Sequence, residues 1–558
     1  MLANLARQAA LTAKKQAVMV SVMAQRGVIR PYRPWALAEM AKTVLDWGLG
    51  FAGGIGALAV RSPEDVAIID ELGELTWSEL DERSTRLANS LRRHGVHEGD
   101  SVAVLCRNHR GFVDISTALS KLGADILYLN TAFAAPQLGE VCKRERPAAI
   151  VYDEEFTGLL DKARVDVPRI LGWCDAEPAG RRAELPTLEN LISDGAARRP
   201  NPPASPTRPV ILTSGTTGTP KGAPRGEAGI DGAVALLSKM PMRSSGRTHI
   251  AAPLFHTWGW AHLNLALLLG STIVLRRKFD PADCLATVAD ESCDALVVIP
   301  VMMQRILQLP EEQRSGSYEH LRVVAASGSS LPGNLATDWM DAFGDNLYNI
   351  YGSTEVAWAT IATPADMRMA PGTAGKPPPN TVVRLYDEHG NPVPDGETGR
   401  IFVGNTMLFG GYTGDDEAGG GHNKEMIDGL MSSGDIGRFD EHGYLFVEGR
   451  DDEMIVSGGE NVFPQEVEDC LTRHSLVEEA AVIGVDDDDF GERLRAFVVT
   501  SSDPSEDDLK AWVKDNLARY KVPREIVFLD ELPRNATGKV LKRELKMHDV
   551  GQSGRAGS

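Results

Sequence analysis

The residues best suited to chemistry in this sequence form a loop rich in glycine and hydroxyl side chains. Residues 212–222 read Leu-Thr-Ser-Gly-Thr-Thr-Gly-Thr-Pro-Lys-Gly and directly follow the apolar pair Val210 and Ile211. Glycines let backbone N–H groups approach an anion closely, and the hydroxyls and Lys221 add donors. The order Pro-Lys-Gly excludes the phosphate loop of kinases, which needs Gly-Lys followed by Ser or Thr. We interpret the stretch as a nucleotide loop; a flexible Ser/Thr/Gly linker is the alternative.

Three further segments combine side chains that suit nucleotide chemistry. Residues 349–355, Asn-Ile-Tyr-Gly-Ser-Thr-Glu, offer an aromatic face, hydroxyls and a carboxylate. Asp435 lies within Ser-Gly-Asp-Ile-Gly, fifteen positions before Arg450. Residues 533–539, Pro-Arg-Asn-Ala-Thr-Gly-Lys, present a lysine at the end of a turn-rich loop near the C-terminus. Each segment alone is a weak signal, but four of them in this order are specific.

In their order and spacing, the four segments resemble those of the adenylate-forming (AMP-binding) superfamily, in its acyl-CoA synthetase branch of fatty-acid–CoA ligases. The resemblance covers roughly residues 55 to 545. It implies that a carboxylate attacks the α-phosphate of ATP, giving an acyl-adenylate and pyrophosphate, and that a thiol then displaces AMP. The implied cofactors are ATP, Mg²⁺ and coenzyme A, and the implied partner is a small-molecule carboxylic acid.

The resemblance also assigns catalytic roles. Lys539 is expected to bridge the acid and the phosphate, as a compact cation with three donors can. His256, Thr354 and Glu355 complete the catalytic set, and Glu355 with Thr216 is expected to hold Mg²⁺. The residues expected to contact ATP are Thr213, Ser214, Gly215, Thr216, Thr217, Gly218, Lys221, Gly328, Ser329, Ser330, Tyr351, Gly352, Ser353, Thr354, Asp435, Arg450 and Lys539.

Within that set, Tyr351 is expected to stack on adenine. Asp435 is expected to accept both ribose hydroxyls, as a carboxylate with two oxygens can, and Arg450 to donate to the same sugar. Residues 328–330 read Gly-Ser-Ser where the family commonly has Gly-Ala-Pro. This departure leaves a backbone role for the loop and puts any role of the two serine side chains in doubt.

A hinge is expected at Asp452, two residues after Arg450, because the family rotates its small C-terminal domain there between the two half-reactions. Gly458 and Gly459 would then line the coenzyme A channel.

Lys542, a few residues after Lys539, is interpreted as a solvated loop lysine.

The acid is expected to lie against His256, Trp258 and Gly259, followed by the leucine-rich run 263–269. Relatives that activate amino acids carry an aspartate early in this segment, whereas here it reads Phe255-His256. An uncharged tail is therefore expected, and the leucines favour a medium- or long-chain fatty acid. The alternatives are an aryl-CoA ligase and a fatty-acyl-AMP ligase that loads a carrier-protein thiol. A non-catalytic nucleotide sensor is a rival from another class.

Composition limits the partners. A net charge of −20 disfavours general nucleic-acid binding, which needs clustered lysine and arginine. Six cysteines without paired spacing argue against a disulfide framework or a zinc site and suit a reducing cytoplasm. A homodimer is left open beside a monomer.

The elements that must position these residues alternate along the chain. Residues 66–70, 101–105, 148–152, 272–275, 295–299 and 321–325 are expected to be strands, and a helix is expected to begin near Thr76. Repeated β-then-α units predict parallel sheets covered by helices. The expected fold class is α/β, with a large N-terminal region of layered subdomains and a small mobile α+β C-terminal domain.

The expected division of the chain follows from these patterns. It comprises a basic helical segment at 1–61, an adenylation domain at 62–449 with two α/β subdomains and a smaller β subdomain, a hinge at 450–453, a C-terminal domain at 454–548 and a disordered tail at 549–558.

The N-terminal segment is basic, unlike the rest of the chain. Residues 1–61 hold eight lysines and arginines against Glu39 and Asp46, a net charge of +6. The apolar run 45–60 is shorter than the roughly 20 residues that span a bilayer. One interpretation is an amphipathic segment that rests on an anionic membrane; the favoured one is a pair of helices packed on the main domain.

Overall fold

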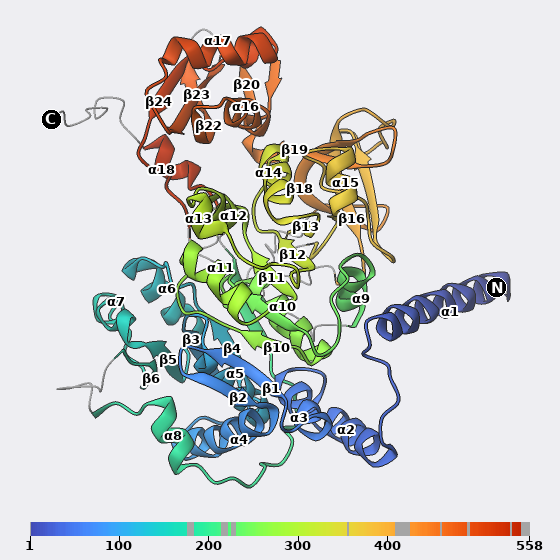
Figure 1. Cartoon of the computed structure of the whole chain (residues 1–558), viewed down its shortest axis with the longest axis vertical. Coiled ribbons are helices and arrows are strands. Elements are labelled where there is room, and N and C mark those ends of the chain that lie inside the picture. Colours follow the sequence, from blue (N-terminus) through green and yellow to red (C-terminus); the bar gives the residue numbers. More distant parts are fainter. Residues whose placement is uncertain are drawn as a thin grey trace.

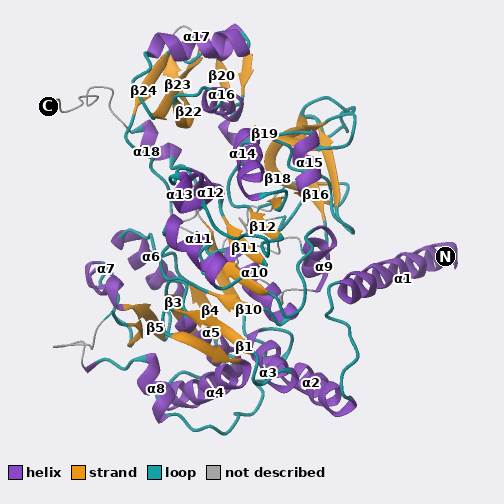
Figure 2. Ribbon diagram, in the orientation of Figure 1, coloured by secondary structure: helices purple, strands orange, loops and turns teal. Residues whose placement is uncertain are grey.

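The computed structural model describes residues 2–175, 184–213, 221–224, 230–353, 356–407, 425–457, 460–487, 491–535 and 538–547. Within these ranges, four β-sheets are accompanied by helices, and the strands that open the chain and those that close it lie at opposite ends of the molecule (Figures 1 and 2). The expected α/β class, with a large N-terminal region and a smaller C-terminal unit, is confirmed.

The largest sheet has eight strands and carries most of the candidate site. Their spatial order is β14 (Thr360–Ala362), β13 (Leu347–Tyr351), β12 (Val323–Ala326), β11 (Ala295–Val298), β9 (Arg247–Ile250), β10 (Thr272–Val274), β1 (Val66–Asp70) and β2 (Gly73–Thr76). The six strands from β13 to β1 pair in parallel, and the two edge strands are antiparallel.

A second sheet of six strands repeats this pattern. Its order is β6 (Arg169–Trp173), β5 (Ala149–Asp153), β3 (Ser101–Leu105), β4 (Asp125–Tyr128), β7 (Pro209–Thr213) and β8 (Lys221–Pro224). Only the β7–β8 pair is antiparallel. All the strands expected from the sequence in this half of the chain are present within two residues of their expected bounds.

The two large sheets share one hydrophobic core. Its buried members come from strands of both sheets, such as Ile68 and Val104, and from the helices between them. The helices of the N-terminal region are α3 (Phe51–Arg61), α4 (Trp77–Arg93), α5 (Arg110–Leu122), α6 (Ala135–Glu145), α7 (Thr157–Lys162), α8 (Leu188–Asp194), α9 (Ile230–Lys239), α10 (Thr257–Leu269), α11 (Pro281–Asp290), α12 (Pro300–Leu307), α13 (Glu311–Arg314), α14 (Gly333–Phe343) and α15 (Pro364–Met369).

Helix α4 shows how sequence determines an element here. Thr76 caps it by accepting from the backbone N–H of Glu79, whose carboxylate accepts in return from the N–H of Thr76, so two otherwise unpaired donors are satisfied. The leucine stripe expected on its inner face, Leu80, Leu87 and Leu91, is fully buried.

Two smaller sheets complete the fold. The third sheet is antiparallel and contains β15 (Val382–Tyr386), β16 (Gly399–Gly404), β18 (Leu430–Phe439), β17 (Met426–Ile427) and β19 (Leu445–Arg450). The fourth contains β21 (Glu460–Val462), β20 (Ile455–Ser457), β23 (Gly491–Thr500), β22 (Val477–Asp487) and β24 (Glu525–Phe528).

The fourth sheet packs with helices of the C-terminal region around cores of their own. These helices are α16 (Pro464–Thr472), α17 (Glu506–Asn516) and α18 (Lys542–Lys546). Ser505 caps α17 through a capping box with Asp508, as the sequence predicts. Short 3₁₀ turns lie at η1 (Glu154–Phe156), η3 (Asp451–Glu453) and η4 (Arg519–Lys521).

The N-terminal segment forms three helices rather than two. Helix α1 (Leu2–Gln25) points away from the body of the molecule (Figure 1), and α2 (Pro34–Trp47) follows it. Helix α3 is mostly buried and joins the main core through Phe51, Ile55 and Leu58. Among the described residues, none of the helices has the length and the apolar character needed to cross a bilayer.

A buried charge network ties α4 to α5. Lys121 is almost fully buried, and its Nζ donates to the Asp81 carboxylate at 2.8 Å, the Asp81 carbonyl at 2.7 Å, Ser84 at 2.9 Å and Thr85 at 2.8 Å. Arg199 pairs with the other oxygen of Asp81 at 2.6 Å. Because each buried polar atom has a partner, the network can stabilise the interface despite the cost of burial.

Replacing Lys121 by methionine should destabilise the fold by about 2–4 kcal/mol, because Asp81 would lose one of its two cations inside the protein. Urea unfolding followed by circular dichroism measures the change. Lys162→Met, at the exposed end of α7, is the control and should leave the midpoint unchanged. An equal effect of the two substitutions would show that the network adds no stability.

Candidate active site

A cavity of about 1670 Å³ lies where several of the sequence-predicted residues meet. Its walls include the segments that follow the carboxyl ends of β9, β11, β12 and β13, four neighbouring strands of the largest sheet. In open α/β sheets this edge is the usual place for a ligand. The third sheet and the C-terminal region close the cavity from other sides.

Tyr351, Asp435 and Arg450 meet in this cavity, as expected from the sequence. The Tyr351 hydroxyl, at the end of β13, donates to Asp435 Oδ2 at 2.5 Å and lies 3.2 Å from Ser433 Oγ. Arg450 Nη1 lies 3.6 Å from Asp435 Oδ1. The fifteen-residue spacing is explained by a hairpin, because Asp435 on β18 and Arg450 on β19 are direct register partners and so project from the same face.

Burial shapes the electrostatics of this cluster. It raises the pKa of the Asp435 carboxyl, while the Tyr351 hydroxyl and the Arg450 charge act in the opposite direction without cancelling it. Burial, together with the neighbouring Asp435, also raises the pKa of Tyr351 well above its usual value. A neutral phenol beside a carboxylate and a guanidinium can accept the ring and the hydroxyls of a nucleoside.

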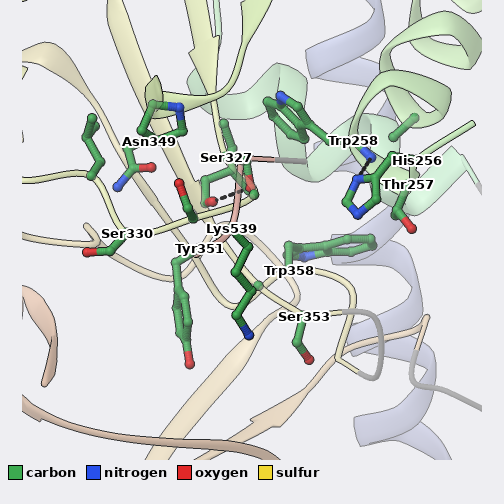
Figure 3. A pocket seen from close by; sticks show the side chains of 18 of the residues that line it. His256, Thr257, Trp258, Ser327, Ser330, Asn349, Tyr351, Ser353, Trp358 and Lys539 are labelled. Atoms are coloured by element: carbon green, nitrogen blue, oxygen red, sulfur yellow. Dashed lines mark hydrogen bonds between the residues drawn. The ribbon is translucent and has the colours of Figure 1, made fainter. Parts of the chain in front are cut away.

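The loop after β12 forms another wall. Ser327 donates to the Ile350 carbonyl at 2.8 Å, and Gly328 has a φ of +97°, which favours glycine. Ser329 and Ser330 also line the cavity. Gly352, after β13, approaches the backbone closely, since a Cβ there would lie 2.2 Å from the Ala357 carbonyl oxygen. Ser353 lines the cavity beside it (Figure 3).

The nucleotide loop connects two antiparallel strands. Thr213, the last residue of β7, pairs with Lys221, the first residue of β8. Thr213 and Lys221 therefore lie side by side at the edge of the second sheet. Several expected ligands lie outside the described residues: Ser214, Gly215, Thr216, Thr217, Gly218, Thr354, Glu355, Gly458 and Gly459. Both expected Mg²⁺ ligands are in this group. Asp452 lies in the 3₁₀ turn η3.

Lys539 reaches the cavity from the C-terminal region (Figure 3). Its loop is closed by backbone pairing: the Asn535 N–H donates to the Lys539 carbonyl at 2.9 Å, and the Lys539 N–H donates to Asn535 Oδ1 at 2.9 Å. Gly538, with a φ of +78°, lies close to the residues that follow β11. A Cβ at this position would lie 2.7 Å from Val301 and 2.9 Å from Ile299. Only glycine allows this approach.

The interpretation of Lys542 as a solvated loop lysine is wrong. Its Nζ lies 3.1 Å from Glu453 in η3 and 2.9 Å from Glu468 in α16. Burial disfavours its charge, but the two carboxylates outweigh this effect and raise the pKa of Lys542. Lys542 therefore ties the loop that carries Lys539 to the segment that follows Arg450.

The part of the cavity beside His256 is aromatic. His256 caps α10, where its Nδ1 accepts from the Trp258 N–H at 3.5 Å, and Trp258 donates from its indole to the Val298 carbonyl at 3.0 Å. Figure 3 shows Trp358 on the same side of the cavity as His256 and Thr257. Trp358 donates to Thr381 Oγ1 at 2.9 Å, which orients the indole.

The expected contact of Gly259 with the acid is corrected by the structure. Gly259 does not line the cavity. A Cβ at this position would lie 2.3 Å from the Pro253 carbonyl oxygen, so the glycine allows α10 to pack closely against residues 252–253. Trp260, in the same aromatic segment as Trp258, and Asn349, in the segment 349–355, also line the cavity. Sequence reasoning missed Trp358 as a lining residue, and its position three residues after Glu355 was its only signal.

Among the described residues, one cluster outside the cavity contains groups that can bind metals. Cys106, His109 and Asp153 are buried together at the ends of β3 and β5. His109 Nε2 lies 2.9 Å from Asp153 Oδ1, and His109 Nδ1 accepts from the Gly111 N–H at 3.1 Å. Both imidazole nitrogens are thus engaged in capping α5 and holding Asp153. We interpret the cluster as structural.

Comparison with known families agrees with this geometry. The model of the AMP-binding enzymes matches residues 57–413, and that of the AMP-binding enzyme C-terminal domain matches residues 466–539. The chain belongs to the AMP-binding enzymes, in the branch of CoA ligases. Its cofactors are those of that branch: ATP, Mg²⁺ and coenzyme A.

Two curated relatives indicate the branch. A feruloyl-CoA synthase from Amycolatopsis is 34% identical over 88% of this chain and 98% of the relative. An indoleacetate–CoA ligase from Aromatoleum aromaticum is 32% identical over 88% of this chain and 95% of the relative.

Two solved structures have the same fold. An anthranilate CoA ligase in complex with anthranoyl-AMP superposes with a TM-score of 0.79 at 25% identity, covering 88% of this chain and 96% of the other. The o-succinylbenzoate CoA synthetase of Bacillus subtilis, in complex with its acyl-adenylate, gives a TM-score of 0.76 at 28% identity, covering 88% and 97%.

Replacing Asp435 by asparagine should raise the KM for ATP about 10- to 100-fold, because an amide offers one acceptor oxygen and no charge. Because its pKa is raised, the Asp435 carboxylate should become protonated at a higher pH than an ordinary carboxyl. The KM for ATP of the unaltered enzyme should therefore increase as the pH falls, and this increase (the acid limb) should begin at a higher pH than an ordinary carboxyl would cause. The Asp435→Asn variant should lack this acid limb.

Initial rates of AMP formation at varied ATP and pH measure both effects. Asp395→Asn, at an exposed position of the third sheet's region, is the control. An acid limb that persists in Asp435→Asn would assign it to another group.

Proposed function

We propose that this chain is an AMP-forming acid–CoA ligase whose substrate is an aromatic or arylalkanoic acid. The observation that carries the proposal is the convergence of three features in one cavity: the Lys539 ammonium, the Tyr351–Asp435–Arg450 cluster and the aromatic wall beside His256. The first supplies a cation, the second suits a nucleoside and the third suits a planar acid.

The first half-reaction joins two anions, the acid and the α-phosphate of ATP. Lys539 bridges them and offsets their repulsion; at an effective dielectric constant near 20, one charge pair at about 4 Å is worth about 4 kcal/mol. Residues 213–221 would contact the β- and γ-phosphates, and Thr354 would donate to the α-phosphate. Glu355 and Thr216 would hold Mg²⁺, which would supply charge neutralisation.

The second half-reaction transfers the acyl group to the thiol of coenzyme A. In the proposal the chain divides as expected from the sequence, and residues 454–548 turn about the hinge 450–453 at Asp452. This movement withdraws Lys539 and brings Gly458 and Gly459 to the thiol channel. During this rotation, the ion pairs that Lys542 makes with Glu453 and with Glu468 would either move together with residues 454–548 or break at η3, which contains Glu453.

An aromatic acid fits better than the fatty acid favoured by the sequence. The relatives described above are named for ferulate, indoleacetate, anthranilate and o-succinylbenzoate. Trp258, Trp260 and Trp358 line the cavity near His256, and flat indole faces pack well against an aromatic ring.

A fatty acid is the second candidate, and one observation favours it. Away from His256 the lining becomes aliphatic, with Leu265, Leu268, Val44 and Leu58. The exposed apolar residues Trp35, Leu37 and Leu45 of α2, within the basic segment 1–61, would suit contact with an anionic membrane that supplies such an acid. A homodimer stays a prediction.

Lys539→Ala should lower the rate of the first half-reaction at least about 100-fold, because the repulsion between acid and phosphate would be uncompensated. Acid-dependent pyrophosphate release measures this step. The second half-reaction, started from synthetic acyl-adenylate and coenzyme A, should keep most of its rate. Lys546→Ala, an exposed lysine on α18, is the control. Full pyrophosphate release by Lys539→Ala would refute the assigned role.

The substrate class is tested with purified protein, ATP, Mg²⁺ and a panel of cinnamic, benzoic, arylacetic and fatty acids. We expect AMP formation that requires both an aryl acid and free coenzyme A. Preference for a fatty acid would favour the second candidate, and AMP formation only with a carrier protein would favour the carrier-loading alternative. Nucleotide binding without turnover of any acid would indicate a sensor and contradict the proposal.

A further inference from the structure

Helix α12 of the large region reaches the C-terminal region through a side chain. Gln304 lies near the middle of α12, and its Nε2 donates to the backbone carbonyl of Glu478 at 2.7 Å. Glu478 belongs to β22, and Figure 1 shows α12 on the side of the large region that faces the C-terminal strands. Both residues line the cavity that Lys539 enters. The hydrogen bond therefore joins the two regions whose relative placement decides where Lys539 lies.

The residue after Glu478 continues this connection toward Lys539. The Glu479 carboxylate accepts from Arg534 Nη2 at 2.8 Å, and Nη1 of the same guanidinium donates to the Gly538 carbonyl at 2.5 Å. Gly538 immediately precedes Lys539 in the chain. The guanidinium of Arg534 thus joins the loop that carries Lys539 to strand β22.

Arginine suits this junction because its guanidinium is planar and its donors point in fixed directions. One terminal nitrogen can meet a carboxylate while the other meets a carbonyl oxygen. The side chains of Arg534 and Glu479 are only 21% and 20% exposed, so solvent screens the pair less than it would a surface pair. Backbone pairing between Arg534 and Val540 closes the loop at its base. A shift of β22 relative to the large region would therefore also move Lys539.

Helix α12 meets the same loop at a second place. A Cβ at Gly538 would lie 2.7 Å from Val301, which precedes Gln304 by three residues on this helix. Residues three positions apart lie on the same face of a helix. One face of α12 thus contacts both β22 and the loop that carries Lys539.

We propose that Gln304 and Arg534 are positioning residues for adenylation: Gln304 holds β22 on the large region, and Arg534 fixes the Lys539 loop to β22. Both side chains act through Lys539 rather than on the reacting atoms. The hydrogen bond of Gln304 is directional and requires the present placement of the C-terminal region, so it favours the arrangement that serves the first half-reaction. In the rotation proposed above, residues 454–548 leave α12 and this bond breaks. The inference rests on the proposed ligase function and on the role proposed for Lys539.

Gln304→Met keeps the length of the side chain and removes its donor. It should lower the single-turnover rate of acid-dependent pyrophosphate release about 3- to 10-fold, the effect of one net hydrogen bond. Acyl transfer from the synthetic adenylate of the same acid to coenzyme A should keep its rate or rise, because the competing arrangement is less favoured. Gln304→Lys, which can still donate, should recover part of the first rate. Gln313→Met, at an exposed glutamine of α13 outside the cavity, is the control.

Arg534→Met removes both contacts of the guanidinium. It should lower the first half-reaction about 10- to 100-fold, because a charge-assisted contact is lost together with a second hydrogen bond. The second half-reaction should change less than about 2-fold. Arg534→Lys keeps the charge without the planar fork and should give an intermediate rate. Arg543→Met, at an exposed arginine of α18, is the control, and thermal unfolding midpoints check that each variant is folded.

The double variant Gln304→Met/Arg534→Lys tests whether the two side chains form one connection. If they do, the Arg534→Lys change should slow the first half-reaction less in the Gln304→Met background than alone, by at least about 2-fold. Effects that simply multiply would show that the two residues act independently and would contradict the proposed connection.

The acid in these assays is the fastest-reacting acid of the panel described above. Equal losses in both half-reactions of Gln304→Met, or no loss in either, would overturn the inference. CoA-dependent AMP formation by the unaltered protein would in that case leave the ligase function standing. Absence of AMP formation with every acid would overturn both, and full pyrophosphate release by Lys539→Ala would overturn the inference together with the role of Lys539.

Discussion

The chemistry of this fold depends on bringing a positive charge from one region of the chain to a cavity built by another. Lys539 belongs to the C-terminal region, whereas the nucleotide cluster and the acid wall belong to the large N-terminal region. Its loop can dock because Gly538 leaves room for Val301 and Ile299, and because Lys542 holds the loop to Glu453 and Glu468. Adenylation requires that two anions approach each other, so the cation must arrive with the correct geometry rather than simply be present.

The buried charges of the Tyr351–Asp435–Arg450 cluster also depend on correctly placed partners. Asp435 would be costly to bury alone, but the Tyr351 hydroxyl donates to its carboxylate, the Arg450 cation lies beside it, and its backbone N–H donates to Ser433 Oγ. The hairpin register that places Asp435 opposite Arg450 keeps this arrangement independent of the ligand. Lys121 and Asp81, which do not line the cavity, show the same rule in a purely structural setting.

The N-terminal helices extend the site beyond the matched family region. Helix α3 is part of the main core and also a wall of the cavity, so its residues have two constraints at once. Leu58 is buried in the core, whereas Arg61, three residues later, is only partly buried and borders the cavity.

The sequence alone determined the secondary structure and the local chemistry. Capping boxes at Thr76 and Ser505, the leucine stripe of α4 and the β-then-α alternation are set by neighbours in the chain, so they could be predicted. Tyr351, Asp435, Arg450 and Lys539 could be singled out from the sequence because each lies in a short motif. Tertiary structure alone decided which residues meet across long separations. Trp358 and Lys542 carry no local signal of their contacts, and Gly259 packs against Pro253 instead of lining the cavity. Such contacts depend on how helices and sheets pack, and packing is a property of the whole chain.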